Sequence, residues 1–302
     1  MQIIESRKEL QLRADAERAA GQRIALVPTM GALHAGHLAL VGEARRRADR
    51  VWLSIFVNPT QFDQAQDFAG YPRELERDLE RCREAGVDLV YTPTVEDLYP
   101  AGAQTWVEVE ELTRPLCGAS RPGHFRGVTT VVSKLLLAAK PHVAVFGQKD
   151  FQQVAVIRRM VCDLGFDVEV VAAPTLREAD GLALSSRNQR LGPEARRQAL
   201  ALVRALDAAE AAAAAGERRT QAILERVRAE IARAPQAALD YAELRDPDSL
   251  APAPAELQGT TLLALAVHFS PDPSGAGAPV RLIDNRLLRL MDQPDGLIWR
   301  TP

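Results

Sequence analysis

The sequence predicts an α/β protein: a Rossmann-like, doubly wound parallel sheet followed by a smaller C-terminal α+β domain. Short apolar segments alternate with helix-like segments through the first half of the chain, which is typical of a parallel sheet with helices on both faces. The composition, with 47% hydrophobic and 25% charged residues, is that of a globular protein. A length of 302 residues suffices for one large domain or two ordinary ones.

The first half supplies the elements of the parallel sheet. Apolar runs predict buried strands at residues 24–27, 51–57, 87–91, 143–146 and 168–171. Helical patterns between them predict helices at residues 38–48, 73–85, 128–139 and 151–164. Because all parallel strands end at the same edge of the sheet, we expect ligands to bind beyond their carboxyl ends.

The pattern changes near residue 176, so we predict domains at residues 1–175 and 176–302. The second would hold a helix over residues 193–215 that stops at Gly216, and another over residues 220–232. Strand-like segments follow at residues 241–244, 261–269 and 280–284. Residues 270–278, rich in Pro, Gly and Ser, predict a flexible loop.

Charge and cysteine content exclude several classes of protein. A net charge of −3 gives no basic footprint for nucleic acid. The three cysteines are scattered without a CxxC pair, which argues against a disulfide framework or zinc site and fits a reducing cytoplasm. The N-terminus lacks the order of a signal peptide, and no apolar stretch approaches the roughly 20 residues of a membrane helix. We therefore expect a cytoplasmic protein.

The segment from His34 to His37 carries the clearest chemical signal. It lies between a predicted strand and a predicted helix, where α/β proteins bind phosphates over the first helical N–H groups. Residues three apart share one helix face, so the spacing aims both imidazoles at whatever the loop holds. Two cations or hydrogen-bond donors beside an anion site suit a phosphate in nucleotidyl transfer. A lone histidine is more often structural, but a pair beside a glycine favours function. A zinc pair would need spacing i, i+4 with a Glu between, which is not present.

Other polar segments also follow predicted strands or precede predicted helices. Gln61 could bind a substrate hydroxyl or carboxylate, although alone it is more typical of a turn residue. Arg121 lies in a basic loop that could bind phosphate or simply be solvated. Gly147 permits close approach of a ligand, and Lys149 stands where only a bound anion makes a cation favourable. Asp150 could bind ribose or a metal-bound water, or cap the helix.

A last segment lies at the predicted domain boundary. Ser185, Ser186 and Arg187 could grip a polyphosphate and close over it as a lid, whereas the plain alternative is a polar linker. The chain contains no P-loop, no GxGxxG fingerprint and no GxSxG elbow.

Together these segments resemble the pantoate–β-alanine ligase (pantothenate synthetase) family, within the wider HxGH nucleotidyltransferase superfamily. The similarity spans nearly the whole chain and is carried by residues 27–37, 54–62, 71–73, 120–127, 146–150, 182–188 and 282–285. The HxGH signature alone would indicate only the superfamily. The full set in this order is specific for the family.

The resemblance implies a two-step reaction. The carboxylate of pantoate attacks the α-phosphate of Mg-ATP, giving pantoyl adenylate and pyrophosphate. The amine of β-alanine then attacks the acyl adenylate and releases pantothenate and AMP. It also implies Mg²⁺ as the metal bound with ATP, and a homodimer. Metal ligands on the protein stay unknown.

The resemblance also implies roles for individual residues. The catalytic set would be His37 as the proton donor of the family, His34, Lys149, Arg187 and Arg121. Gln61 and Gln153 would bind pantoate, with Gln61 also near β-alanine. The implied ATP site consists of Met30, Gly31, Ala32, Leu33, His34, Ala35, Gly36, His37, Gly147, Gln148, Lys149, Asp150, Leu176, Leu184, Ser185, Ser186 and Arg187.

Two departures and two rival functions accompany this interpretation. Gln148 stands where charged residues are common in the family, and residues 270–278 are longer than the usual tight turn. Another HxGH adenylyltransferase would not need Gln61 or Gln153 and would usually lack the C-terminal domain. A non-catalytic nucleotide-binding module would be expected to lack the His pair, Lys149 or Arg187, all of which are present.

Overall fold

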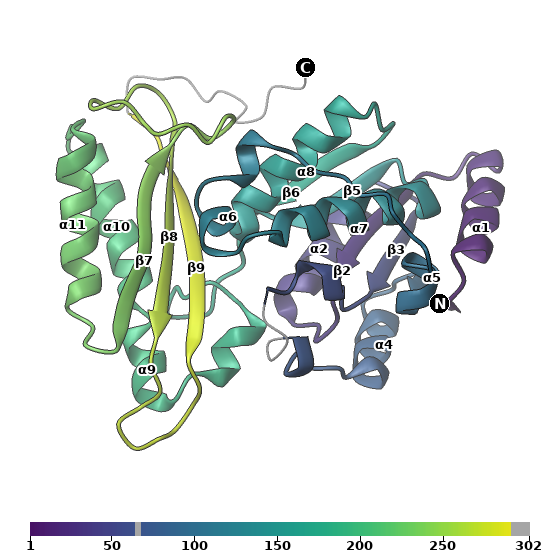
Figure 1. Ribbon diagram of the computed structural model, residues 1–302, viewed down its shortest axis with the longest axis horizontal. Helices are drawn as coiled ribbons and strands as arrows, with labels where there is room; N and C mark the ends of the chain where they lie inside the picture. Colours follow the sequence, from purple (N-terminus) through teal and green to yellow (C-terminus); the bar gives the residue numbers. More distant parts are fainter. Residues whose placement is uncertain (64–67, 291–302) are drawn as a thin grey trace. The chain divides into compact units, whose positions relative to one another are not determined.

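The computed structural model describes residues 1–63 and 68–290. The chain divides into two compact units, Met1–Pro174 and Thr175–Pro302, here called the N-terminal and C-terminal units. Each is described by itself. The N-terminal unit is the α/β part of the chain and the C-terminal unit contains a separate antiparallel sheet (Figure 1).

The N-terminal unit is built on a six-stranded, all-parallel sheet in the order β1-β4-β3-β2-β5-β6. Its strands are β1 (Gln2–Ile4), β2 (Ile24–Thr29), β3 (Arg50–Ile55), β4 (Leu89–Tyr91), β5 (Val143–Gly147) and β6 (Glu169–Ala173). The predicted doubly wound fold is therefore confirmed. Strand β1 was not predicted, because a three-residue edge strand with two exposed residues carries no long apolar run.

Helices cover both faces of this sheet (Figure 1). They are α1 (Arg7–Ala19), α2 (Ala35–Arg45), α4 (Leu75–Glu84), α5 (Val95–Leu98), α6 (Cys117–Ser120), α7 (His124–Ala139) and α8 (Phe151–Asp163). Helices α2 and α4 pack on the face that includes Ala25 and Val27 of β2. The alternate residues of β2 point to the other face, where α1 and α7 contact β2 and α8 contacts β5 and β6.

Strand order places a topological switch point between β2 and β5. These strands are paired neighbours, yet β2 continues through α2 to β3 on one side, and β5 continues through α8 to β6 on the other. The segments that leave the two strands therefore diverge and form a crevice at the carboxyl edge, where doubly wound sheets bind ligands. Residues 30–37 follow β2 and residues 148–153 follow β5.

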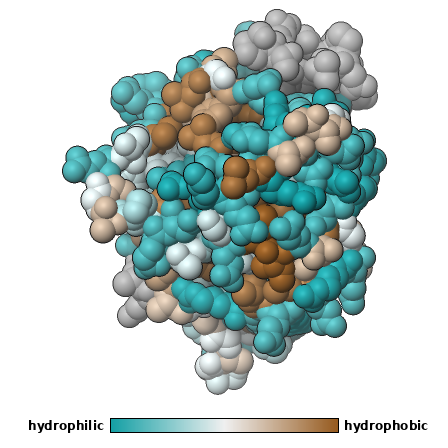
Figure 2. All heavy atoms as spheres, turned by 90° about the vertical axis from the view of Figure 1, so that its right-hand side faces the viewer, coloured by the Kyte–Doolittle hydropathy of each residue, from teal (hydrophilic) through white to brown (hydrophobic). Residues whose placement is uncertain are grey.

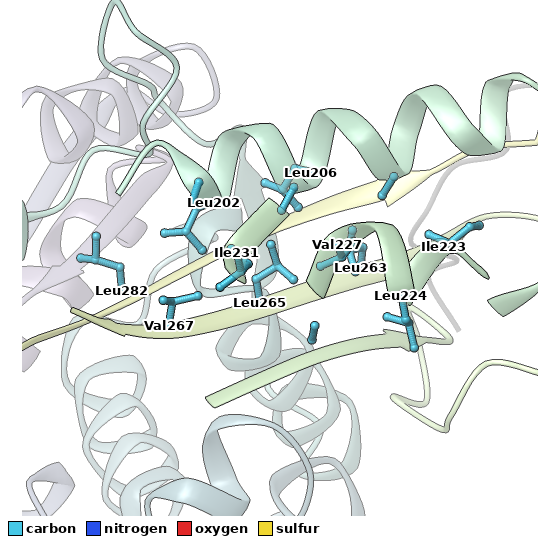
Figure 3. Close-up of a cluster of buried hydrophobic side chains, with 14 of the residues drawn as sticks. Leu202, Leu206, Ile223, Leu224, Val227, Ile231, Leu263, Leu265, Val267 and Leu282 are labelled. Atoms are coloured by element: carbon cyan, nitrogen blue, oxygen red, sulfur yellow. The ribbon is translucent and has the colours of Figure 1, made fainter. Parts of the chain in front are cut away.

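The C-terminal unit packs helices on one face of an antiparallel sheet. The strands are β7 (Ala237–Arg245), β8 (Thr261–Phe269) and β9 (Val280–Leu288), and the helices are α9 (Pro193–Gln198), α10 (Ala201–Ala214) and α11 (Thr220–Ala232). Figure 3 shows Leu202 and Leu206 of α10 and Val227 of α11 directed toward Leu263 and Leu265 of β8. Burial of these apolar side chains stabilises the unit.

One expectation for this unit needs correction. Residues 193–215 do not form one helix, because the chain turns more tightly at Ala199, where the Leu202 N–H bonds the Ala199 carbonyl. The segment 270–278 contains neither helix nor strand, as predicted for a loop, and Asp272 anchors it. The buried Asp272 carboxylate accepts bonds from the N–H groups of Glu194 and Ala195 and so caps α9.

The surface of the described chain is mixed in character. Figure 2 shows a face that is mostly hydrophilic, with separate hydrophobic patches. Within residues 1–63 and 68–290, none of the helices is both long and apolar enough to span a bilayer.

Candidate active site

The turn that follows β2 has an unusual backbone. Gly31 has φ +83° and Ala32 has φ +49°, so the chain reverses between the strand and α2. A Cβ atom on Gly31 would lie 2.9 Å from the Asp78 Oδ2 atom and 3.1 Å from Ile55 Cγ2, so both the positive φ and the lack of space require glycine. The turn brings residues 32–37 to the carboxyl edge of the sheet.

Asp78 holds this turn and was missed by sequence reasoning. Its carboxylate is buried in α4 and accepts hydrogen bonds from the Ala32 N–H (2.8 Å) and the Leu33 N–H (2.7 Å). The only sequence signal is weak: Asp78 shares a face of α4 with the buried Cys82, so it is a polar residue at a core position. Its partners lie 45 and 46 residues earlier, beyond the reach of a local pattern.

The two histidines present the same nitrogen to the crevice. His34 is the N-cap of α2, and its Nδ1 accepts from the Gly36 N–H (3.1 Å). The Nδ1 of His37 accepts from the His34 N–H (3.2 Å). A backbone N–H can only donate, so each Nδ1 carries the lone pair and each proton lies on Nε2. Both rings therefore act as Nε2–H donors. Their centroids lie 4.1 Å apart.

Both imidazoles are neutral at neutral pH. Burial, reinforced by electrostatic repulsion from His34 and Lys149, lowers the pKa of His37 to about 3. Burial also lowers the pKa of His34, and the charges of Lys149 and Arg81 act in the same direction. Asp150 opposes the shift at both rings. Since these charges act on the imidazoles, the structure brings Lys149 and Asp150 close to the His pair.

Lys149 and Asp150 reach the site from the end of β5. Gly147 ends the strand, and the 3₁₀ turn Gln148–Asp150 leads into α8. Asp150 is the N-cap residue of α8, but its side chain makes no cap hydrogen bond, so the capping role considered above does not apply.

Two neighbouring glutamines in the first turn of α8 have different surroundings. Gln152 is buried and binds the Cys117 N–H and the carbonyls of Leu112 and Pro115, which is a structural role. Gln153 is only partly buried and follows Asp150 by three residues, so it shares that face of the helix start.

Gln61 contacts Met30, which lies in the turn that follows β2. It ends the 3₁₀ turn Pro59–Gln61 after β3, and its Nε2 is 3.0 Å from the Met30 sulfur. Its Oε1 accepts from the Nδ2 of Asn58 (3.1 Å). The structure therefore joins the segments after β2, β3 and β5 at one edge of the sheet.

Arg121 is engaged in this neighbourhood. Its guanidinium donates to the Gln61 carbonyl (3.2 Å) and to an Asp63 carboxylate oxygen (3.3 Å). His124 Nδ1 lies 2.8 Å from the same carbonyl and must donate to it. These contacts fix the backbone of Gln61. A direct bond from Arg121 to phosphate stays a prediction.

The remaining predicted ATP residues belong to the C-terminal unit. Leu176 and Leu184 face each other in a hairpin closed by the bond from the Leu184 N–H to the Leu176 carbonyl (2.9 Å). Ser185 caps the following turn Ser186–Arg190 by accepting from the Arg187 N–H (3.2 Å). This local network fixes the backbone of the predicted lid segment within its own unit.

The motif at residues 282–285 has a structural role in the same hairpin. The fully buried Asp284 carboxylate forms a two-pronged ion pair with Arg177 (2.7 and 3.0 Å). Arg177 also donates to the Gly181 carbonyl (3.0 Å), so the pair ties β9 to the hairpin turn.

The N-terminal unit thus offers a site for a polyphosphate. Two imidazole N–H donors, the ammonium of Lys149 and the N-terminus of α2 converge at the switch point. Across residues 1–63 and 68–290, no group of three or more His, Cys, Asp or Glu side chains is arranged to hold a metal ion.

Comparison with known proteins places this site in a family. The family model described as "Pantoate-beta-alanine ligase" matches residues 2–287. Pantothenate synthetase of Geobacter sulfurreducens is 52% identical over 288 residues, which cover 95% of this chain and 99% of that protein. The enzyme of Moorella thermoacetica is 53% identical over 277 residues, covering 92% and 95%.

Solved structures agree with these relatives. A pantothenate synthetase from Thermus thermophilus matches with a TM-score of 0.86 and 45% identity, covering 95% of this chain and 99% of that one. Pantoate–β-alanine ligase from Francisella tularensis, complexed with "Beta-gamma ATP" and β-alanine, matches with a TM-score of 0.73 and 32% identity, covering 95% and 97%. With a family model spanning both units and relatives above half identity, the chain belongs to the pantoate–β-alanine ligase family.

Proposed function

We propose that this chain condenses pantoate with β-alanine at the expense of ATP. In the first step a pantoate carboxylate oxygen bonds to the α-phosphorus of ATP, and the bond to the bridging oxygen breaks to release pyrophosphate. In the second step the amine of β-alanine attacks the acyl carbon, loses a proton and displaces AMP. The observation that carries this proposal is the convergence of the neutral His34–His37 pair and Lys149 at the switch point, beside Gln61.

The segment from Met30 to His37 is assigned to the phosphates of ATP, with Gly147, Gln148, Lys149 and Asp150 on the opposite side of the crevice. The orientation of both Nε2–H groups supports this, because neutral donors stabilise charge that develops on phosphate oxygens without first losing a proton. His37 then acts as a hydrogen-bond donor, with His34 beside it. Lys149 neutralises phosphate charge.

Gln61 and Gln153 are assigned to pantoate, and Gln61 also to β-alanine. The Nε2 of Gln61 donates to the Met30 thioether sulfur, a weak acceptor that a substrate oxygen would replace at little cost. Leu176, Leu184, Ser185, Ser186 and Arg187 are assigned to the nucleotide as well, and Arg121 would add positive charge. A lid that excludes water would protect the adenylate from hydrolysis.

Mg²⁺ is assigned as part of the substrate Mg-ATP. The residues present fit that role, since Mg²⁺ usually binds through substrate phosphates, waters and one or two carboxylates rather than in an all-protein cage. Asp150 supplies a carboxylate at the phosphate site that is not used to cap α8. A cytoplasmic location and a homodimer stay predictions.

The direct test is an omission assay. Purified protein is incubated with Mg-ATP, pantoate and β-alanine, each left out in turn, and AMP, pyrophosphate and pantothenate are followed. We expect pantothenate and AMP to form only when all three substrates are present. Exchange of pyrophosphate into ATP should need pantoate but not β-alanine. Exchange that needs a phosphate-bearing acceptor instead of pantoate would contradict the proposal and favour another adenylyltransferase.

A further inference from the structure

We propose that Tyr99 is a positioning residue for substrate recognition, acting through Asn58 to fix which end of the Gln61 amide faces pantoate. The inference rests on the proposed function, in which Gln61 binds pantoate. Tyr99 directly follows α5 and lies 41 residues from Asn58, outside every motif that identifies the family.

The amide of Asn58 can adopt only one orientation. Its Nδ2 donates to the Oε1 of Gln61 and to the Gly127 carbonyl, both at 3.1 Å, which uses both hydrogens. Its Oδ1 accepts from the Tyr99 hydroxyl (2.9 Å) and from the hydroxyl and N–H of Thr60 (3.0 and 3.4 Å). A flipped amide would set its oxygen against two acceptors. Asn58 is fully buried, so water cannot repair such a mismatch.

This orientation is passed on to Gln61. Because its Oε1 accepts from Asn58, the other end of the amide, Nε2, must point toward Met30. Nε2 carries two donors, which match the carboxylate and hydroxyl oxygens of a hydroxy acid. If the Asn58 bond were weakened, Gln61 could turn its carbonyl oxygen toward the substrate carboxylate and repel it.

Tyr99 is suited to hold Asn58 firmly. Its ring packs near Phe56 and Trp106, with centroids 6.5 and 6.4 Å away, and Lys134 Nζ lies 5.2 Å from its centroid. Burial raises the pKa of Tyr99, so the hydroxyl stays a donor across the working pH range. The backbone of Gln61 is fixed separately, by His124 and Arg121. The Tyr99 hydroxyl also lies 3.2 Å from the Thr60 hydroxyl. Its loss should therefore loosen the Asn58 amide and, through it, the Gln61 side chain, while the Gln61 backbone stays in place.

The test compares two tyrosine variants of the full chain in pantoate-dependent pyrophosphate exchange. Tyr99→Phe removes the hydroxyl and keeps the ring, and we expect KM for pantoate to rise roughly 3- to 10-fold, the size of one hydrogen bond, with KM for Mg-ATP unchanged. Tyr91→Phe is the matched control. The buried Tyr91 hydroxyl donates to Asp97 of α5 (2.6 Å), and within the described part of the chain it forms no hydrogen bond with Asn58 or Gln61. Its loss removes a buried tyrosine hydroxyl of the same kind and should leave KM for pantoate unchanged.

A double-mutant cycle separates positioning from general damage. In a Gln61→Ala background, assayed at high enzyme concentration, Tyr99→Phe should cause no further loss of kcat/KM for pantoate. Equal losses in both backgrounds, or equal rises in KM for pantoate and Mg-ATP, would overturn the role of Tyr99. Wild-type protein without any pantoate-dependent exchange would instead overturn the proposed function on which the inference rests.

Discussion

The two histidines of the HxGH motif illustrate how a single residue gains its chemistry from its neighbours. In each ring, a backbone N–H occupies Nδ1 and so leaves the proton on Nε2. Burial and nearby positive charge keep both rings neutral. The sequence allowed either cations or donors here, and the hydrogen bonds decide for donors.

Replacing His37 by Gln should lower the rate of pyrophosphate exchange about 100- to 1000-fold, the typical loss for one donor to developing negative charge. The control is His142→Gln. His142 also accepts a backbone N–H at Nδ1, from Ile24 at 3.0 Å, but lies at the opposite end of β2. Rates from steady-state assays and melting temperatures of both variants check this. A His37 variant that works at the wild-type rate would disprove its role.

The pKa shifts predict a distinct pH response. His37 should not titrate between pH 6 and 7.5, and the pKa of His34 should lie below its usual value of 6.5, as followed by the imidazole Cε1–H shifts in NMR spectra. Since the pKa of His37 is about 3 in the folded protein and 6.5 for a free imidazole, the unfolded chain binds more protons between these values. Its contribution to stability is complete above pH 6.5 and declines as pH falls toward 3. A His37 resonance that titrates near pH 6.5 would contradict the assignment.

At the scale of elements, the active-site turn depends on a helix that lies later in the chain. Asp78 of α4 accepts two N–H groups of the turn after β2, and Gly31 gives its carboxylate room. The strand–turn–helix unit alone therefore does not determine the position of His34.

Asp78→Asn should test this dependence. An amide offers only one acceptor where two N–H groups point, so one is left unsatisfied and the free energy of unfolding should drop by about 1–3 kcal/mol. Exchange activity should fall with it. Cys82→Ala, one turn along the same buried face, should cost stability by leaving a cavity and keep the activity. Denaturant unfolding and exchange rates separate the two, and a fully active Asp78→Asn protein would refute the role of Asp78.

The elements that could be predicted from the sequence are those with a strong local pattern. The segment 261–269 is a run of apolar residues and forms β8 with those bounds, and 220–232 forms α11. Helix α1 was missed because Leu10 is the one large apolar residue it buries, and its cap Ser6 is a weak signal. The break at Ala199 has no Gly or Pro to announce it.

The candidate site was predictable where function leaves a local motif, as at His34, His37 and Lys149. The parts of the site that depend on partners far away in the sequence were not predictable. Asp78 and Tyr99 act through hydrogen bonds to residues 45 and 41 positions away, so no spacing in the sequence could reveal them. Asn58 lies only three residues before its partner Gln61, but its bond to Tyr99 likewise depends on the fold.

At the scale of the whole molecule, the parallel sheet gathers the site from three separated segments. The carboxyl ends of β2, β3 and β5 lie at one edge, which places Met30, Gln61 and Lys149 in one neighbourhood although they span much of the N-terminal unit. The family match extends through the C-terminal unit as well, to residue 287. The whole molecule has to hold a reactive acyl adenylate and keep water from it until the amine of β-alanine attacks.

The central claim, a pantoyl adenylate formed at this site, is tested most directly by isotope transfer. Pantoate labelled with ¹⁸O in its carboxylate is turned over with Mg-ATP and β-alanine, and the nucleotide product is examined by mass spectrometry. Attack of the carboxylate on the α-phosphate predicts AMP that carries one ¹⁸O atom. Label found in inorganic phosphate, with ADP as the nucleotide product, would show an acyl phosphate route and contradict the account.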